Sequence, residues 1–209
     1  TEMASALASL DRLSPSSNMS NRLSEAIVEC FKHTNGAPIT FTEMLKEYQS
    51  RMKDPDKDDS ISSILKQLDR ANIFDTEDKA DLVGDSFIVK MDGYPKDGPI
   101  AKAIVYFLMS KLNNIYEQLD KQAVNDDVVQ IRHFSIIDEA HYMLSFDNRP
   151  LRNLIAVGRN KGLSIILATQ NMADFKNKGF DFYANAQYPL IMKQQTIDDK
   201  VIKDLFGVS

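Results

Sequence analysis

Residues 134–141 read Phe-Ser-Ile-Ile-Asp-Glu-Ala-His, and residues 163–169 read Leu-Ser-Ile-Ile-Leu-Ala-Thr. The first stretch closes an apolar run over 128–137, which predicts a β-strand that ends in two acidic residues. The second stretch is apolar nearly throughout, which is typical of a strand covered on both faces. A helix is predicted between them over 149–160. This order of strand, helix and strand, with short loops, implies parallel strands joined by a crossover.

The rest of the region after residue 85 fits the same alternation. We expect a short strand at 86–91, a long helix that opens at Pro99, a third strand at 188–192 and a last helix at 198–206. The sequence therefore predicts an α/β domain over residues 86–209, with a mainly parallel sheet flanked by helices.

The first 85 residues have a different character, because helical patterns alternate there with polar loops. Two predicted helices cover 7–12 and 22–33. A third starts from a cap at Thr40 or Thr42, and a fourth starts from a cap at Asp59 or Ser60. We expect residues 1–85 to form a helical subdomain that serves as a lid or spacer. The alternative is a winged-helix-like unit, since short apolar runs at 73–74 and 81–89 follow the helices.

Composition excludes several classes of protein. With 209 residues, 43% of them hydrophobic and 26% charged, the chain is not a disordered one. The apolar runs fall far short of the roughly 20 residues of a membrane span. A net charge of −5 argues against a surface that binds nucleic acid everywhere, although a local basic patch remains compatible with it.

The ends of the chain and its cysteine content indicate the cellular compartment and the extent of the chain. Cys30 is the single cysteine, so the chain has no internal disulfide, and the first residues lack the basic segment and apolar run of a signal peptide. We therefore expect a cytoplasmic protein. The missing initiator Met and the abrupt end at Phe206-Gly-Val-Ser209 favour an excised fragment.

Asp138 and Glu139 form the sharpest candidate site. They follow an apolar strand, and ligands bind at the carboxyl ends of strands in open α/β sheets. Nucleotide phosphates carry Mg²⁺, which takes oxygen ligands, so we expect Asp138 to hold the Mg²⁺ shell. Glu139 would face the other way and polarise an attacking water. The alternative is that the two carboxylates merely end a strand at the surface.

A second motif lies before the second strand. Residues 158–162 read Gly-Arg-Asn-Lys-Gly, and the strand that they precede ends in Ala168-Thr169-Gln170. Together with the acidic strand end, this order resembles the HerA/FtsK branch of hexameric P-loop ATPases that pump DNA. The resemblance covers about residues 86–195. Within the branch, the chain looks most like the C-terminal ATPase part of the DptH-type proteins of phosphorothioate-dependent DNA restriction.

The resemblance implies a RecA-like core that uses ATP and Mg²⁺ to move or unwind double-stranded DNA. It also implies a ring of identical subunits, further restriction-system subunits as partners, and no membrane. It assigns five residues by position: Asp138 as the Mg²⁺-shell acid, Glu139 as the catalytic base, Arg159 as the arginine presented to ATP on a neighbouring subunit, and Thr169 with Gln170 as the γ-phosphate sensor. A guanidinium suits the role given to Arg159, because its planar fork stabilises charge on phosphoryl oxygens. Arg149 and Arg152 are the alternatives to it.

One motif of that branch is missing. A P-loop needs Gly-x-x-x-x-Gly-Lys-Ser/Thr, and none of the eight glycines here is followed by Lys. We expect the motif in sequence upstream of this chain. The fragment alone is therefore expected neither to bind ATP tightly nor to hydrolyse it, whereas the whole protein is expected to be an ATPase.

Two other functions fit part of the pattern. Asp138-Glu-Ala-His141 also spells the acidic box of superfamily-2 helicases, but their later Ser-Ala-Thr motif is replaced here by Ala168-Thr169-Gln170. A regulatory or assembly module without catalysis would account for the missing P-loop.

The remaining candidates carry weaker signals. Asp54, Asp56 and Asp58 lack the Gly and Glu that complete a Ca²⁺ loop, so we expect a solvated loop. Cys30 and His33 have no second pair of metal ligands, and Cys30 is predicted to lie in the core. The other candidates, each with a surface or packing role as the alternative, are His141 for coupling to the base and Lys161, Lys176, Lys178 and Lys193 for DNA phosphates.

Overall fold

The computed structural model describes residues 2–10, 15–34, 37–73, 81–126, 128–146, 148–177, 180–192, 200 and 202–203. Contacts between Cα atoms divide the chain into two compact units, Thr1–Leu108 and Met109–Ser209. The junction falls inside helix α5 (Pro99–Gln118). The domain boundary predicted at residue 85 stays a prediction.

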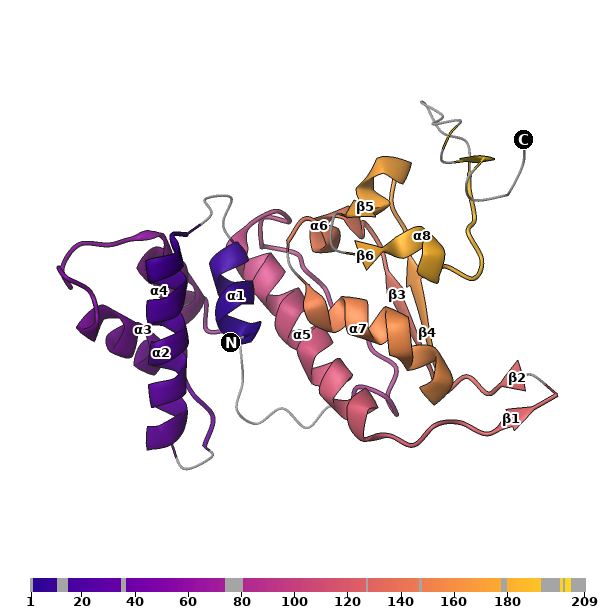
Figure 1. The fold of residues 1–209 in the computed structure, drawn as a ribbon, viewed down its shortest axis with the longest axis horizontal. Coiled ribbons are helices and arrows are strands. Elements are labelled where there is room, and N and C mark those ends of the chain that lie inside the picture. The colour runs from indigo at the N-terminus through magenta and orange to yellow at the C-terminus, as the bar shows by residue number, and fades with distance from the viewer. Residues whose placement is uncertain are drawn as a thin grey trace. The chain divides into compact units, whose positions relative to one another are not determined.

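Helices form the first unit (Figure 1). They are α1 (Glu2–Ser9), α2 (Ser17–His33), α3 (Phe41–Ser50), α4 (Ser60–Ala71) and the start of α5. Helix α2 packs against α1 and α3, and α3 packs against α4. The largest fully buried side chains between them are Leu7, Leu10, Leu23, Met44, Tyr48, Ile61, Ile64, Leu65 and Leu68.

Side-chain caps explain where these helices begin. Ser16 accepts a hydrogen bond from the first turn of α2, which therefore starts five residues before the predicted start at residue 22. Thr40 and Glu43 form a reciprocal capping box on α3, and Asp59 and Ser62 form one on α4. Of the two predicted pairs of alternatives, the structure thus selects Thr40 and Asp59.

The second unit contains short strands between helices. After the end of α5 come the antiparallel pair β1 (Val124–Asn125) and β2 (Val128–Val129), then β3 (His133–Ile137), α6 (His141–Leu144), α7 (Arg149–Val157) and the 3-10 turn η1 (Gly158–Lys161). They are followed by β4 (Leu163–Leu167), η2 (Met172–Phe175), the antiparallel pair β5 (Lys176–Asn177) and β6 (Phe180–Asp181), and α8 (Phe182–Asn185).

Strands β3 and β4 run parallel and side by side (Figure 1), as the strand–helix–strand order predicts. His133 pairs with Leu163 at one end and Ile137 with Leu167 at the other. Backbone hydrogen bonds continue past the strand ends, because the N–H of Ala140 donates to the carbonyl oxygen of Ala168 at 2.8 Å. The residues that follow the two strands are therefore neighbours at one edge of the pair.

The predicted RecA-like, mainly parallel sheet is wrong. Helices account for 54% and strands for 9% of the structure, and the described residues contain only two-stranded sheets. The expected strands at 86–91 and 188–192 are not strands, and their apolar side chains are exposed, with Ile88 at 85% and Leu190 at 87%. An apolar, β-rich run becomes a strand only when another strand pairs with it, and the pattern does not name that partner.

Two further findings concern the chain as a whole. No helix in the described ranges is long and apolar enough to cross a membrane. Most of the helix predicted at 198–206 lies outside the described residues, so that prediction is not tested.

Candidate functional site

The acidic residues lie at the carboxyl end of β3. Asp138 is exposed, and its Oδ1 accepts a hydrogen bond from the backbone N–H of Glu139 at 2.9 Å. Glu139 has a φ of +51°, a left-handed conformation that is uncommon outside glycine and occurs often at functional sites. The strand thus ends in a tight turn at the two acidic residues.

Gln170 reaches this turn from β4. Its amide Nε2 donates a hydrogen bond of 2.9 Å to Oε1 of Glu139, across 31 residues of sequence. The contact exists because β3 and β4 are parallel and in register, so that both strands end at the same edge. Two residues that the sequence analysis selected from separate motifs are therefore direct partners.

His141 lies on the other side of the Glu139 carboxylate. Its Nδ1 is 3.3 Å from Oε2, and the two groups form an ion pair when the imidazole is protonated. The His141 ring also lies against the ring of Tyr142, with centroids 4.0 Å apart. The structure thus brings His141 to the predicted base.

Thr169 has a different partner from Gln170. Its hydroxyl is hydrogen-bonded to the carboxylate of Asp174 in η2. The predicted sensor pair is therefore divided, with Gln170 on the candidate base and Thr169 on a neighbouring turn. Sequence analysis missed Asp174, because the short polar segment around it carries no periodic or motif signal.

Three residues of the Gly-Arg-x-Lys-Gly turn have structural roles. A Cβ on Gly158 would lie 2.7 Å from the Leu163 side chain, and one on Gly162 would lie 2.7 Å from the carbonyl oxygen of Gln130. Gly162 also has a φ of +80°, which favours glycine. Lys161 caps the end of α5, because its ammonium group donates hydrogen bonds to the carbonyl oxygens of Tyr116 and Glu117.

Lys161 is thus engaged in packing rather than presented to DNA phosphates. Arg159, in contrast, is exposed. It precedes β4, whereas Glu139 follows β3, and a five-residue strand spans roughly 16 Å. Arg159 and the acidic residues therefore lie at opposite edges of the strand pair within one chain.

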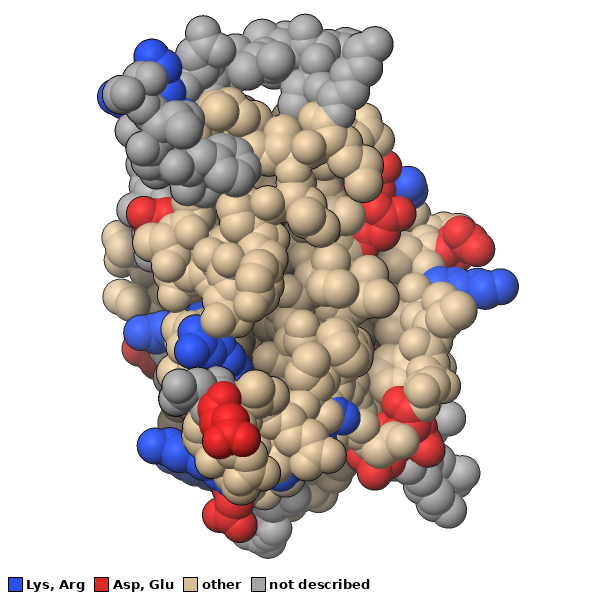
Figure 2. Space-filling model, turned by 90° about the vertical axis from the view of Figure 1, so that its right-hand side faces the viewer, with Lys and Arg blue, Asp and Glu red and all other residues tan. Residues whose placement is uncertain are grey.

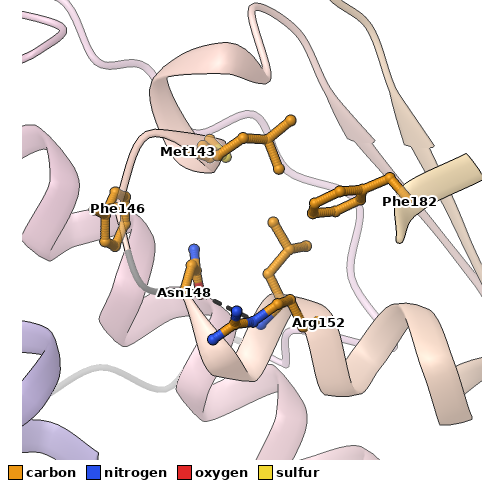
Figure 3. Close-up of a pocket in the computed structure, with 7 residues that line it drawn as sticks. Met143, Phe146, Asn148, Arg152 and Phe182 are labelled. Carbon is orange, nitrogen blue, oxygen red and sulfur yellow. Dashed lines mark hydrogen bonds between the residues drawn. The ribbon is translucent and has the colours of Figure 1, made fainter. Parts of the chain in front are cut away.

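The alternative arginines lie on α7. Arg149 is exposed, and Arg152 lines a cavity of about 10 Å³ whose other walls include Met143, Phe146, Asn148 and Phe182 (Figure 3). Such a volume holds about one water molecule, far less than a nucleotide needs. The cavity is thus a packing defect beside α7 and not a nucleotide pocket.

The weaker metal candidates do not assemble. The described residues contain no group of three or more His, Cys, Asp or Glu side chains placed to hold a metal ion. Asp58 pairs with Lys66 at 2.6 Å, and His33 pairs with Glu29 at 3.4 Å. Cys30 is buried, as predicted, and burial raises the pKa of its thiol.

Charge on the surface gives no sign of a broad DNA-binding face in the view of Figure 2. Uncharged residues form the centre of that face, and Lys, Arg, Asp and Glu lie toward its margins. Of the lysines proposed for DNA contact, Lys178 and Lys193 lie outside the described residues, and only the backbone of Lys176 is described.

Comparison of the chain with protein-family models and with curated proteins finds no match in either. The resemblance to DNA-pumping ATPases therefore stands on the acidic strand end, the Gly-Arg-x-Lys-Gly turn and the Thr-Gln strand end.

Proposed function

We propose that the carboxyl edge of the β3–β4 pair is the water-activating part of an ATP-hydrolysing site. The observation that carries this proposal is the 2.9 Å hydrogen bond between Gln170 and Glu139. It joins the carboxyl ends of two parallel strands, so that the candidate base and an amide donor are in contact at one edge of the strand pair.

Each residue at this edge has a chemical task. Asp138 is exposed and keeps an oxygen available for the waters of a Mg²⁺ shell. One or two carboxylates are enough for Mg²⁺, because the substrate phosphates and waters supply the remaining ligands. Glu139 orients the attacking water and accepts its proton, and Gln170 joins the base to the end of β4.

Arg159 serves a second copy of the chain. It is exposed at the edge opposite to Glu139, so the two cannot meet on one nucleotide within one chain. In a head-to-tail ring, the arginine edge of one copy faces the acidic edge of the next. The guanidinium then stabilises the charge on the transferred phosphoryl group.

The nucleotide's phosphates require donors that this chain does not carry, since no Gly-Lys-Ser/Thr loop occurs in its sequence. The proposed whole protein contributes that loop and uses the released energy to move double-stranded DNA. Its DNA contacts are few, local and made to phosphates, because the net charge of this chain is −5. Such contacts weaken as salt rises.

The test replaces Glu139 by Gln in the protein that contains the phosphate-binding loop. We expect E139Q to bind ATP as the wild type does and to lose hydrolysis, because an amide does not accept the water's proton. The control is E117Q, at a carboxylate of α5 that is bonded to Asn113. Full hydrolysis by E139Q would contradict the proposal and favour a regulatory or assembly module.

A further inference from the structure

The second carboxylate oxygen of Glu139 and Nδ1 of His141 share an unusual environment. Both atoms are buried from solvent, and neither has an aligned hydrogen-bond partner within the part of the chain that the structure describes. They lie 3.3 Å from each other. Buried polar atoms without partners are costly, and a small rotation of the imidazole would pair these two.

The groups around the pair restrict how it can form. Gln170 already occupies Oε1, so the carboxylate presents Oε2 to the histidine. The ring of Tyr142 lies against the imidazole, and the backbone N–H of Tyr142 donates to the carbonyl oxygen of Glu139 at 3.1 Å. A backbone hydrogen bond therefore connects the turn that carries His141 to Glu139, the residue that the imidazole faces.

We propose that His141 is a positioning residue for Glu139, which holds Oε2 while Gln170 holds Oε1. This inference rests on the proposed function, in which Glu139 is the base. A carboxylate held at both oxygens keeps one orientation toward the attacking water, which is the arrangement that a general base needs. His141 acts through Glu139 and does not itself touch the nucleotide.

The pairing can be measured on this chain without nucleotide. Nitrogen NMR reports which ring nitrogen of a histidine carries the proton and what it bonds to. We expect the Nδ1 resonance of His141 to shift in E139Q and to stay in place in E117Q. An Nδ1 resonance that is identical in wild type and E139Q would overturn the inference, whatever the protein hydrolyses.

Measurement of ATP hydrolysis, in the protein with the phosphate-binding loop, then distinguishes a positioning role of His141 from a packing role. The amide nitrogen of Asn lies close to the position of histidine Nδ1, whereas that of Gln lies close to Nε2. We expect H141A and H141Q to lower kcat at least tenfold with little change in KM, and H141N to restore most of it. The control H33N alters a histidine that pairs with Glu29 in the first unit and should match the wild type.

The NMR and hydrolysis experiments together distinguish failure of the base assignment of Glu139 from failure of the positioning role of His141. If E139Q shifts the His141 resonance but also hydrolyses ATP like the wild type, the base assignment fails, and the positioning role fails with it. If E139Q is inactive and H141A keeps the wild-type kcat, the positioning role alone is wrong.

Discussion

Gly162 and Gly93 allow two reasons for requiring glycine to be compared: the backbone conformation and the lack of space for a Cβ. Both have a positive φ, +80° and +91°, which disfavours any residue with a Cβ. A Cβ on Gly162 would also meet the backbone of Gln130 and Arg132, whereas one on Gly93 would meet nothing within 4 Å. The turn before β4 therefore depends on glycine for space as well as for conformation.

We expect G93A to lower the free energy of unfolding by about 1 kcal/mol, the cost of the left-handed conformation. We expect G162A to lower it by about 3 kcal/mol, because the overlap with backbone atoms adds to that cost. Urea unfolding followed by circular dichroism measures both. Equal losses in the two variants would show that the close approach to Gln130 has no energetic weight.

Tyr48 gives the first unit a dependence on alkaline pH. It is fully buried, and its hydroxyl donates to Asp59 at 2.6 Å. Burial, together with the hydrogen bond to Asp59 and its negative charge, raises the pKa of Tyr48. A raised pKa in the folded state means that stability is complete below the ordinary tyrosine value of about 10 and is lost as the pH rises above it.

We therefore expect the midpoint temperature of unfolding to decrease as the pH rises above about 10, the ordinary tyrosine pKa, and not below it. Y48F should be less stable at neutral pH and should show a shallower decline over this range. Y188F, at a residue that is 84% exposed, is the matched control and should behave as the wild type does. A decline that is equally steep in Y48F would assign the effect to other groups.

The site residues that sequence analysis located are those whose position follows from a motif at a strand end. The strand pattern located Asp138 and Glu139, the resemblance to the ATPases singled out Gln170, and the structure brings Gln170 into contact with Glu139. Asp174 could not be found, because its contact with Thr169 depends on how η2 turns back. The role of Lys161 was missed for the same reason, since its partners lie on α5.

At the scale of elements, α3 and α4 begin with the same kind of cap but differ in what the cap also holds. Thr40 bonds within its own turn. Asp59 caps α4, accepts the Tyr48 hydroxyl at 2.6 Å and pairs with Arg22 at 3.3 Å. The second cap therefore connects three helices.

We expect T40A to cost about 1 kcal/mol of unfolding free energy, which is typical of a lost N-cap. D59A should cost about 3 kcal/mol, because it also leaves the Tyr48 hydroxyl without its acceptor. D59N keeps a capping oxygen and should lie between the two. A loss in D59A no larger than in T40A would show that the link to Tyr48 adds nothing.

Helices were easier to predict than strands for a physical reason. The pattern of α2, α4 and α7 is complete within each helix, since its apolar face and its cap are local in sequence. A strand depends on a partner from elsewhere in the chain. The strand predicted over 128–137 is confirmed only over His133–Ile137, because Val128–Val129 pair with β1 instead. Phe134 and Ile136, both exposed on β3, show that an apolar strand can form without the predicted sheet around it.

At the scale of the whole molecule, the proposed site uses residues from two opposite edges of one strand pair. The acidic edge and Arg159 lie at opposite ends of β3 and β4. A site that needs both must therefore be built from two copies, with each copy giving one edge to each neighbour.

Mixing two inactive variants tests this claim most directly. In the protein that contains the phosphate-binding loop, E139Q keeps the arginine edge and R159A keeps the acidic edge, so the proposed ring, assembled from both variants, contains some interfaces with the two wild-type residues. We predict that each variant alone lacks ATP hydrolysis and that the mixture regains part of it, whereas a mixture of E139Q with the double variant stays inactive. R149A, the exposed arginine of α7, should be active alone. A mixture of E139Q and R159A that remains as inactive as its components, although the rings form, would contradict the account.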